Sequence, residues 1–299
     1  FMVQHAPSLS GGIPMLIDCH THAFQAEDLT VLRERLTFLD DHLPDDSPHK
    51  WQLHGPGTIA GLTQAMEEAG VDRWVLLPVS GKKDRAADLN RWAAQAAAAE
   101  PRLIPFAMLH PLGPVADDVR LIQELGLRGV KLHPFIQRFS VDHPVTHDLL
   151  GLLEGAGLPV LLDTLYVAGL VAAKPHLGWV VEMFNFGGCE PVQIARAAVA
   201  HPGVRFIAAH GGSLYGWDHL EPLYDLDNVY FDISYLMGLI DREPLLQIIR
   251  RKGPERVLYG SDAPWREAKA FRAWFEDLRL STWEREQVAA GTLVGLLNL

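Results

Sequence analysis

Short apolar runs alternate with longer amphipathic stretches along most of the chain. Several runs, such as VLLPV and RFIAAH, are apolar at nearly every position. Strands that are covered on both faces have this composition, and strands that alternate with helices are typical of a parallel sheet joined by crossover helices. The pattern predicts eight strands, at Met15–Cys19, Arg73–Val79, Leu103–Leu109, Gly129–His133, Pro159–Thr164, Val204–His210, Asn228–Ser234 and Val257–Asp262.

Helical stretches fill the gaps between these strands, and many of them end at a glycine just past the last turn. The predicted helices are Thr58–Gly70, Arg85–Glu100, Val115–Leu125, Val145–Gly157, Val192–His201, Glu243–Lys252 and Glu267–Leu278, with a further one possible at Leu29–Leu39.

Eight strands with alternating helices predict an α/β fold of the (β/α)8 TIM-barrel type. The structural rival is an open doubly wound sheet, but such a sheet usually has fewer strands, and no GxGxxG follows the first strand. We expect a single domain over residues 1–299. Two connections, at about 23–57 and 165–190, are longer than a barrel needs, and long ordered loops often form lids or binding walls.

Composition limits the partners that the protein can have. The formal net charge is -11 at pH 7 and no Lys/Arg-rich run occurs, which disfavours nucleic acid and anionic membranes as partners. We expect a small-molecule substrate, and a homo-oligomer stays open. Cys19 and Cys189 are expected to be free thiols. Residues 1–14 lack a basic start followed by an apolar stretch, so a cytoplasmic protein is expected.

Three predicted strand ends carry groups that can bind a metal ion. His20 and His22, in IDCHTH, follow the first strand, and a period of two turns both imidazoles to one side while Cys19 faces the helices. Asp262 closes the last strand and His210 the sixth. Imidazole and carboxylate groups bind zinc and similar ions, and barrel active sites lie at the carboxyl ends of the strands. We therefore expect His20, His22 and Asp262 to meet around one ion.

The order of IDCHTH, GVKLHP, PVLLDT, FIAAHGG, VYFDIS and VLYGSDAPW resembles the amidohydrolase superfamily. The resemblance is to the amidohydrolase-related branch, which includes metal-dependent hydrolases and aminocarboxymuconate-semialdehyde-type decarboxylases, and it runs from Met15 to Leu299. It implies that His20 and His22 are metal ligands and that Asp262 is both a ligand and a proton acceptor. It also implies that His210 orients or polarises the substrate.

Two segments depart from the pattern of that branch. PVLLDT places Asp163 where relatives have a histidine, and the chain ends in GTLVGLLNL rather than a GNALRLLGL-like sequence. Asp163 could replace the imidazole as an oxygen ligand, which would make a two-histidine, two-aspartate site that tolerates zinc and also suits manganese. Alternatively, Asp163 only forms hydrogen bonds. We expect one divalent metal ion, with zinc first and manganese as the alternative.

Four further residues are expected to contact the substrate. Lys131 and His133 share a strand face in GVKLHP and end in the same barrel mouth, while Arg138 and Trp265 lie in nearby loops. The resemblance leaves a second role open for Lys131, because two-metal relatives carry a carbamylated lysine on the fourth strand. Arg266 is another cation near a strand end, although solvated surface is the simpler interpretation for it and for Arg138.

These residues predict a metal-dependent hydrolase that acts on an amide, lactone or ester bond of a small, possibly carboxylated, ring compound. The metal would activate a water molecule, Asp262 would take its proton, and His210 would help to stabilise the developing oxyanion. The main alternative is non-oxidative decarboxylation of an aromatic or muconate-type acid in the same site. A further alternative is a non-catalytic binding barrel with a degenerate metal site.

Overall fold

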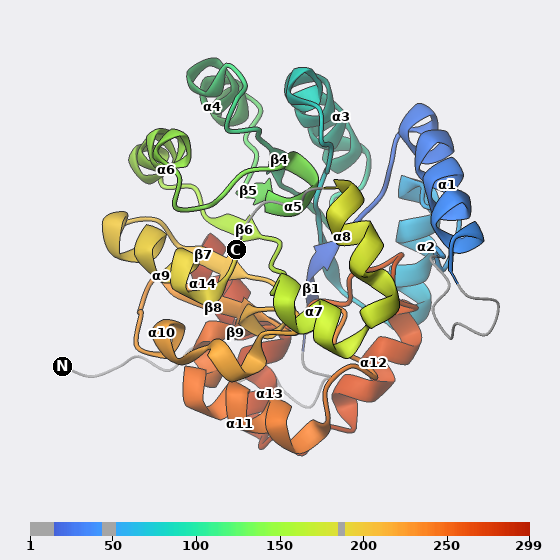
Figure 1. Ribbon diagram of the computed structural model, residues 1–299, viewed down its shortest axis with the longest axis vertical. Helices are drawn as coiled ribbons and strands as arrows, with labels where there is room; N and C mark the ends of the chain where they lie inside the picture. The colour runs from blue at the N-terminus through green and yellow to red at the C-terminus, as the bar shows by residue number, and fades with distance from the viewer. Residues whose placement is uncertain (1–14, 44–51, 185–188) are drawn as a thin grey trace.

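The computed structural model describes residues 15–43, 52–184 and 189–299. Residues 1–14, on which the cytoplasmic prediction depends, and parts of both long connections lie outside the described residues. Parallel strands occupy the centre of the molecule (Figure 1). They are β1 (Ile17–Thr21), β2 (Arg73–Leu76), β3 (Leu103–Pro105), β4 (Ala107–Met108), β5 (Val130–Leu132), β6 (Val160–Leu162), β7 (Phe206–Ala208), β8 (Val229–Asp232) and β9 (Val257–Leu258).

One predicted strand, Leu103–Leu109, is divided into β3 and β4. β3 pairs with β2 on one side, whereas β4 pairs with β5 on the other. Between them, the N–H of Phe106 still donates to the carbonyl of Leu76 at 3.1 Å. The two segments are therefore one barrel strand that changes partner, and the remaining strands pair in sequence order from β4 to β9.

Hydrogen bonds join the last strand to the first. The N–H of Cys19 donates to the carbonyl of Tyr259 at 2.9 Å, and the N–H of Asp262 donates to the carbonyl of His20 at 2.8 Å. The molecule is thus a TIM barrel, as the sequence predicted. These bonds also bring the two ends of the chain that carry the expected metal ligands side by side.

Helices surround the strands (Figure 1). Each of the seven helices predicted between the strands is present to within a few residues, because its sequence supplies both an apolar face and end signals. The Thr58 side chain accepts from the N–H of Gly61 at the start of its helix, which ends at Gly70 with φ 64°. The seven are α2 (Ile59–Ala69), α3 (Ala86–Ala99), α4 (Val115–Glu124), α6 (Pro144–Ala156), α9 (Pro191–Ala200), α11 (Arg242–Lys252) and α12 (Ala268–Glu276).

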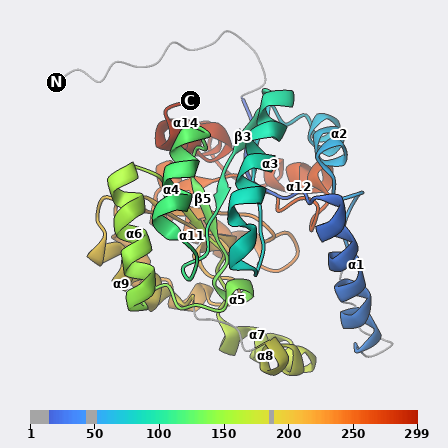
Figure 2. The ribbon, with the colours of Figure 1, turned by 90° about the horizontal axis from the view of Figure 1, so that it is seen from above.

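The long connections contain more helix than the sequence analysis assigned. The possible helix at Leu29–Leu39 is α1 and spans Ala26–Asp41. The second connection contains α7 (Val167–Ala173) and α8 (Gly178–Phe184), which are too short to show a clear helical period. Leu43, after α1, packs with Leu177 and Val180. Figure 2 shows α7 and α8 at one end of the barrel and α14 (Thr292–Leu297) at the other.

Two apolar layers hold the barrel together. The larger one lies between the strands and the surrounding helices. The smaller one combines alternate strand residues with residues of α14 and therefore fills the barrel interior. Cys19 belongs to this interior layer, so its predicted position toward the helices is wrong. The register of β1 against β2 shifts between Asp18 and Thr21, and this irregularity turns both Cys19 and His20 inward.

Several further short helices in the described part of the chain were not predicted. They are α5 (Pro134–Gln137), α10 (Glu221–Tyr224) and α13 (Thr282–Glu286), together with α14 and a π-helical turn at Gln287–Gly291. Over the described ranges, no helix combines the length and the apolar character that a membrane crossing requires.

Candidate metal centre

His20 is held at the end of β1 with one ring nitrogen engaged. Its Nδ1 lies 2.8 Å from Oδ2 of Asp232, and the side chain is fully buried. Burial, with a smaller effect of Lys131, lowers the pKa of His20 to about 4, although Asp232 and Asp262 act in the opposite direction. The imidazole is therefore neutral at pH 7. Since Nδ1–H donates to Asp232, Nε2 carries the lone pair.

His22 is oriented in the same way by a backbone carbonyl. Its Nδ1 donates to the carbonyl of Leu77 at 2.8 Å, which leaves Nε2 as the acceptor. Oδ1 of Asp262 lies 3.2 Å from this Nε2 and 3.7 Å from Nε2 of His20. Burial alone would raise the pKa of Asp262, but the neighbouring His20 and His22 lower it, so the carboxylate is ionised at neutral pH.

These three side chains suit a divalent cation. Bonds of roughly 2.0–2.1 Å in a tetrahedral site place neighbouring ligand atoms about 3.3 Å apart. The two separations from Oδ1 of Asp262 bracket that value. The same oxygen is buried and has no hydrogen-bond partner among the described residues, which is costly unless a cation satisfies it. The donor set and the unpartnered oxygen thus fit a metal ion.

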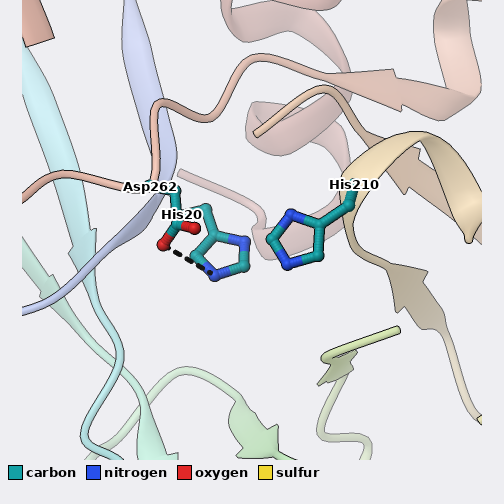
Figure 3. Close-up of side chains that lie close together, drawn as sticks. All are labelled: His20, His210 and Asp262. Atoms are coloured by element: carbon teal, nitrogen blue, oxygen red, sulfur yellow. Dashed lines mark ion pairs between the residues drawn. The ribbon is translucent and has the colours of Figure 1, made fainter. Parts of the chain in front are cut away.

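His210 faces His20 and Asp262 from the loop after β7, as Figure 3 shows. One ligand atom from each of these three residues lies within 4.8 Å of the others, so His210 is a second candidate for the third ligand. Its Nδ1 donates to the carbonyl of Ser234 at 3.1 Å, and its Nε2 lies 3.6 Å from Oδ2 of Asp163. We favour His22, because its Nε2 lies 3.2 Å from Oδ1 of Asp262, whereas Nε2 of His210 lies beside Asp163.

A carboxylate keeps His210 in its cationic form. Burial by itself would lower the pKa of His210, but Asp163, with smaller contributions from Asp262 and Asp232, outweighs burial and raises it to about 9. The backbone N–H of His210 donates to Oδ1 of Asp232 at 2.9 Å, and the backbone φ of His210 is 58°. His210 is therefore a protonated imidazole with a fixed orientation beside the candidate metal ligands.

Asp163 lies beside Lys131, His133 and His210 rather than against Asp262. Its Oδ2 accepts from Nζ of Lys131 at 2.9 Å and lies 3.3 Å from Nε2 of His133. Burial opposes ionisation, yet the interactions with His133, Lys131 and His210 prevail and lower the pKa of Asp163 well below its usual range. Within the described part of the chain, its ion pairs are with these three residues. A ligand role for Asp163 remains a proposal.

Lys131 and His133 do converge at the mouth of the barrel, as their shared strand face predicted. Nζ of Lys131 also lies 3.2 Å from Nε2 of His20, and only 1% of the lysine is exposed. Burial lowers the pKa of His133 to about 3, with Asp163 opposing and Lys131 adding to the shift, so this imidazole is neutral. Its Nδ1 is buried without a partner among the described residues.

The other two expected substrate contacts have different surroundings. The ring of Trp265 lies 6.5 Å from that of Phe24, which in turn lies 6.4 Å from the imidazole of His22. Trp265 is thus connected to the metal centre by a row of rings. Arg138 is exposed at the end of α5, and its side chain has no hydrogen bond or ion pair with any residue that the structure describes. The structure does not bring Arg138 to the cluster.

The sequence analysis assigned no role to Asp232 and Ser234, which organise both central histidines. Ser234 Oγ lies 3.0 Å from Nδ1 of His20 and 2.9 Å from Nδ1 of His210. Both residues belong to VYFDIS, where polar groups interrupt an apolar strand at a spacing of two. That interruption at a strand end is the signal that points to them.

Comparison with known proteins gives a family match and fold neighbours. A family model described as Amidohydrolase matches residues 17–292. The comparison with curated protein sequences found no match.

Three solved structures illustrate the likeness in fold. The 5-carboxyvanillate decarboxylase LigW from Sphingomonas paucimobilis is 17% identical with a TM-score of 0.71, over 96% of this chain and 100% of that one. A dihydroxybenzoic acid decarboxylase from Polaromonas sp. JS666 with bound manganese is 19% identical with a TM-score of 0.67, over 96% and 98%. An uncharacterised TIM-barrel protein from Bordetella bronchiseptica is 19% identical with a TM-score of 0.69, over 95% and 98%.

Proposed function

The chain belongs to the amidohydrolase family, and we propose that it is a metal-dependent decarboxylase of a small aromatic or unsaturated carboxylic acid. Membership of this enzyme superfamily favours an enzyme over the non-catalytic binding barrel. The observation that carries the proposal is the buried, unpartnered oxygen of Asp262 beside two imidazole nitrogens. Decarboxylation is favoured over hydrolysis because two of the solved structures with the same fold are decarboxylases, one of them with manganese.

His20, His22 and Asp262 would hold the metal ion. When bound, a divalent metal supplies a Lewis acid that fixes a substrate oxygen and stabilises negative charge on it. The ionised carboxylate of Asp262 and the neutral state of His20 both suit that role. Either manganese or zinc is compatible with two nitrogen ligands and one oxygen ligand.

Loss of carbon dioxide breaks the bond between the carboxylate and its carbon and leaves an electron pair on that carbon. The pair must take up a proton, so the reaction needs an acid near the scissile bond. His210 is suited to this task, because Nδ1–H is committed to the carbonyl of Ser234 and Nε2 faces the barrel mouth beside Asp163. We assign Nε2–H of His210 as the proton donor.

Hydrolysis of an amide, lactone or ester bond, which the sequence analysis placed first, uses the same cluster differently. There, ionised Asp262 accepts a proton from water, and His210 stabilises an oxyanion. This reading stays a prediction. The two reactions differ in their products, so one assay separates them.

The test is a product assay on manganese-loaded protein in deuterated water. The substrates are hydroxybenzoates, benzene dicarboxylates and muconate-type acids, with aryl esters and lactones alongside. The proposal expects carbon dioxide in equal amount to a product that carries deuterium at the carbon which bore the carboxylate. Cleavage of the esters or lactones, with no carbon dioxide from any acid, would contradict it and support hydrolysis.

A further inference from the structure

Arg266 lies beside the metal centre and has no acidic partner among the described residues. It follows Asp262 by four residues and is half-buried, and its N–H donates to the carbonyl of Asp262 at 3.3 Å. Its guanidinium carbon lies 4.1 Å from the centre of the Tyr235 ring, and one terminal nitrogen donates to the carbonyl of Tyr235 at 3.3 Å. Nε is buried and has no partner among the described residues.

A comparison with Arg251 shows what is missing at Arg266. The guanidinium of Arg251 also stacks on a tyrosine, at 4.2 Å from the Tyr224 ring, but it forms an ion pair with Glu221 at 2.6 Å. Arg266 forms no ion pair within the part of the chain that the structure describes, although the protein carries a net charge of -11. A half-buried guanidinium with an unpartnered N–H is a ready site for an anion.

Backbone strain fixes the surface on which Arg266 rests. Tyr235 has φ 65°, and three other non-glycine residues in the same region share this left-handed conformation: His210 at 58°, Tyr215 at 60° and Asp262 at 67°. Such conformations are energetically unfavourable for residues other than glycine and gather at binding sites. The Tyr235 ring lies 6.0 Å from the ring of His210. The Tyr235 ring therefore lies next to both Arg266 and the proposed proton donor.

We propose that Arg266, supported by Tyr235, binds a carboxylate of the substrate that is not lost in the reaction. Binding the departing carboxylate would stabilise the ground state more than the transition state, in which the charge moves onto carbon. A retained carboxylate keeps its charge throughout, so the arginine can hold it without opposing the reaction. The substrate class is then a small aromatic or unsaturated acid with two carboxylates. The statement that the other carboxylate is the one lost rests on the proposed function, whereas the binding of a carboxylate at Arg266 does not.

The test measures binding rather than turnover. Dissociation constants of benzoate and of the benzene 1,2-, 1,3- and 1,4-dicarboxylates are measured by calorimetry on manganese-loaded protein, for wild type and Arg266→Gln. In wild type, at least one dicarboxylate should bind ten-fold or more tightly than benzoate. In Arg266→Gln this preference should fall to within two-fold, with benzoate itself little changed, because a neutral amide cannot form the charge-assisted pair.

Two variants control for structural effects. Arg285→Gln alters another arginine that stacks on an aromatic ring, at 5.6 Å from Phe275, and bonds to backbone carbonyls, so it should keep the preference. Tyr235→Phe retains the ring on which Arg266 stacks, so this variant should also retain the preference for a dicarboxylate over benzoate. The inference is overturned if no dicarboxylate exceeds benzoate in wild type, or if Arg266→Gln retains the preference. If the protein releases no carbon dioxide but its preference for a dicarboxylate depends on Arg266, only the proposed reaction is contradicted.

Discussion

The carboxylate of Asp232 fixes the imidazole of His20 through a hydrogen bond of 2.8 Å from Nδ1. The other oxygen of Asp232 accepts a hydrogen bond from the backbone N–H of His210 at 2.9 Å. A single side chain at the end of β8 therefore orients two histidines, one from β1 and one from the loop after β7. The pKa of Asp232 lies well below its usual value, because its interaction with His20, with a smaller one from His210, outweighs the effect of burial. This arrangement presents Nε2 of His20 to Asp262.

Asp232→Asn should weaken metal binding without unfolding the protein. The amide has no charge to favour the Nδ1–H tautomer of His20, and loss of such a partner typically costs 10–100-fold in metal affinity. The measurement is the dissociation constant for manganese and zinc by competition with a chelator dye. Asp118→Asn, at a buried aspartate in α4, is the control and should leave the affinity unchanged. Equal affinities in wild type and Asp232→Asn would contradict the assigned orientation.

His210→Asn should separate proton donation from metal binding. Asparagine tolerates the left-handed backbone at this position but cannot donate a proton as an acid. We expect kcat to fall by about 10²–10⁴-fold while the metal content stays near that of wild type. Metal analysis beside the product assay checks both. Loss of the metal together with activity would instead make His210 a ligand in place of His22.

Asp163→Asn should destabilise the metal-free protein. Lys131 donates to Asp163 at 2.9 Å with 1% and 8% of their side chains exposed, and removal of one partner of a buried ion pair typically costs about 3–5 kcal/mol. Removal of both partners, in Lys131→Met with Asp163→Leu, should restore most of that loss. The free energy of unfolding in urea measures both changes. A single variant as stable as wild type would mean that the two groups are not paired.

Acid should reduce stability in part through Glu284. A hydrogen bond from Arg250, together with the N–H of Ser281, lowers the pKa of Glu284 from 4.5 to about 2. The unfolded chain therefore binds a proton first as the pH falls, so the contribution of Glu284 is complete above pH 4.5 and is lost toward pH 2. Near neutral pH, the free energy of unfolding of wild type should exceed that of Glu284→Gln by about 1 kcal/mol. Urea unfolding at several pH values should show the gap closing in acid, and a gap independent of pH would refute this.

The barrel follows from the sequence because its strands are buried on both faces and its helices carry clear end signals. No sequence signal marks the interruption of the third strand at Phe106. The interruption arises because the segment before Phe106 pairs with β2 and the segment after it pairs with β5. The inward position of Cys19 was also missed, because an irregularity in β1 breaks the period of two. Gly260 is part of the reason, since a methyl group there would lie 2.9 Å from Cβ of His20 and 3.2 Å from Sγ of Cys19.

The candidate site shows a similar division. His20, His22 and Asp262 were placed together by their positions at strand ends, which a barrel brings to one face. The neighbours of Asp163 could not be predicted from strand positions alone. Its ion pair with Lys131 depends on how far the lysine side chain extends from one strand toward the next. The sequence analysis interpreted Arg266 as solvated surface. Its stacking on Tyr235 and its buried Nε distinguish it from a solvated cation.

The most direct test of the account is the metal content of His20→Ala with His22→Ala, measured by mass spectrometry after loading with manganese and dialysis. A matched variant, His147→Ala with His201→Ala, removes two other histidines that contact each other at 2.9 Å outside the cluster. The account predicts about one equivalent of metal in wild type and in the matched variant, and less than about a tenth in the His20 and His22 variant, with its fold retained. A full equivalent of metal in that last variant would contradict the central claim.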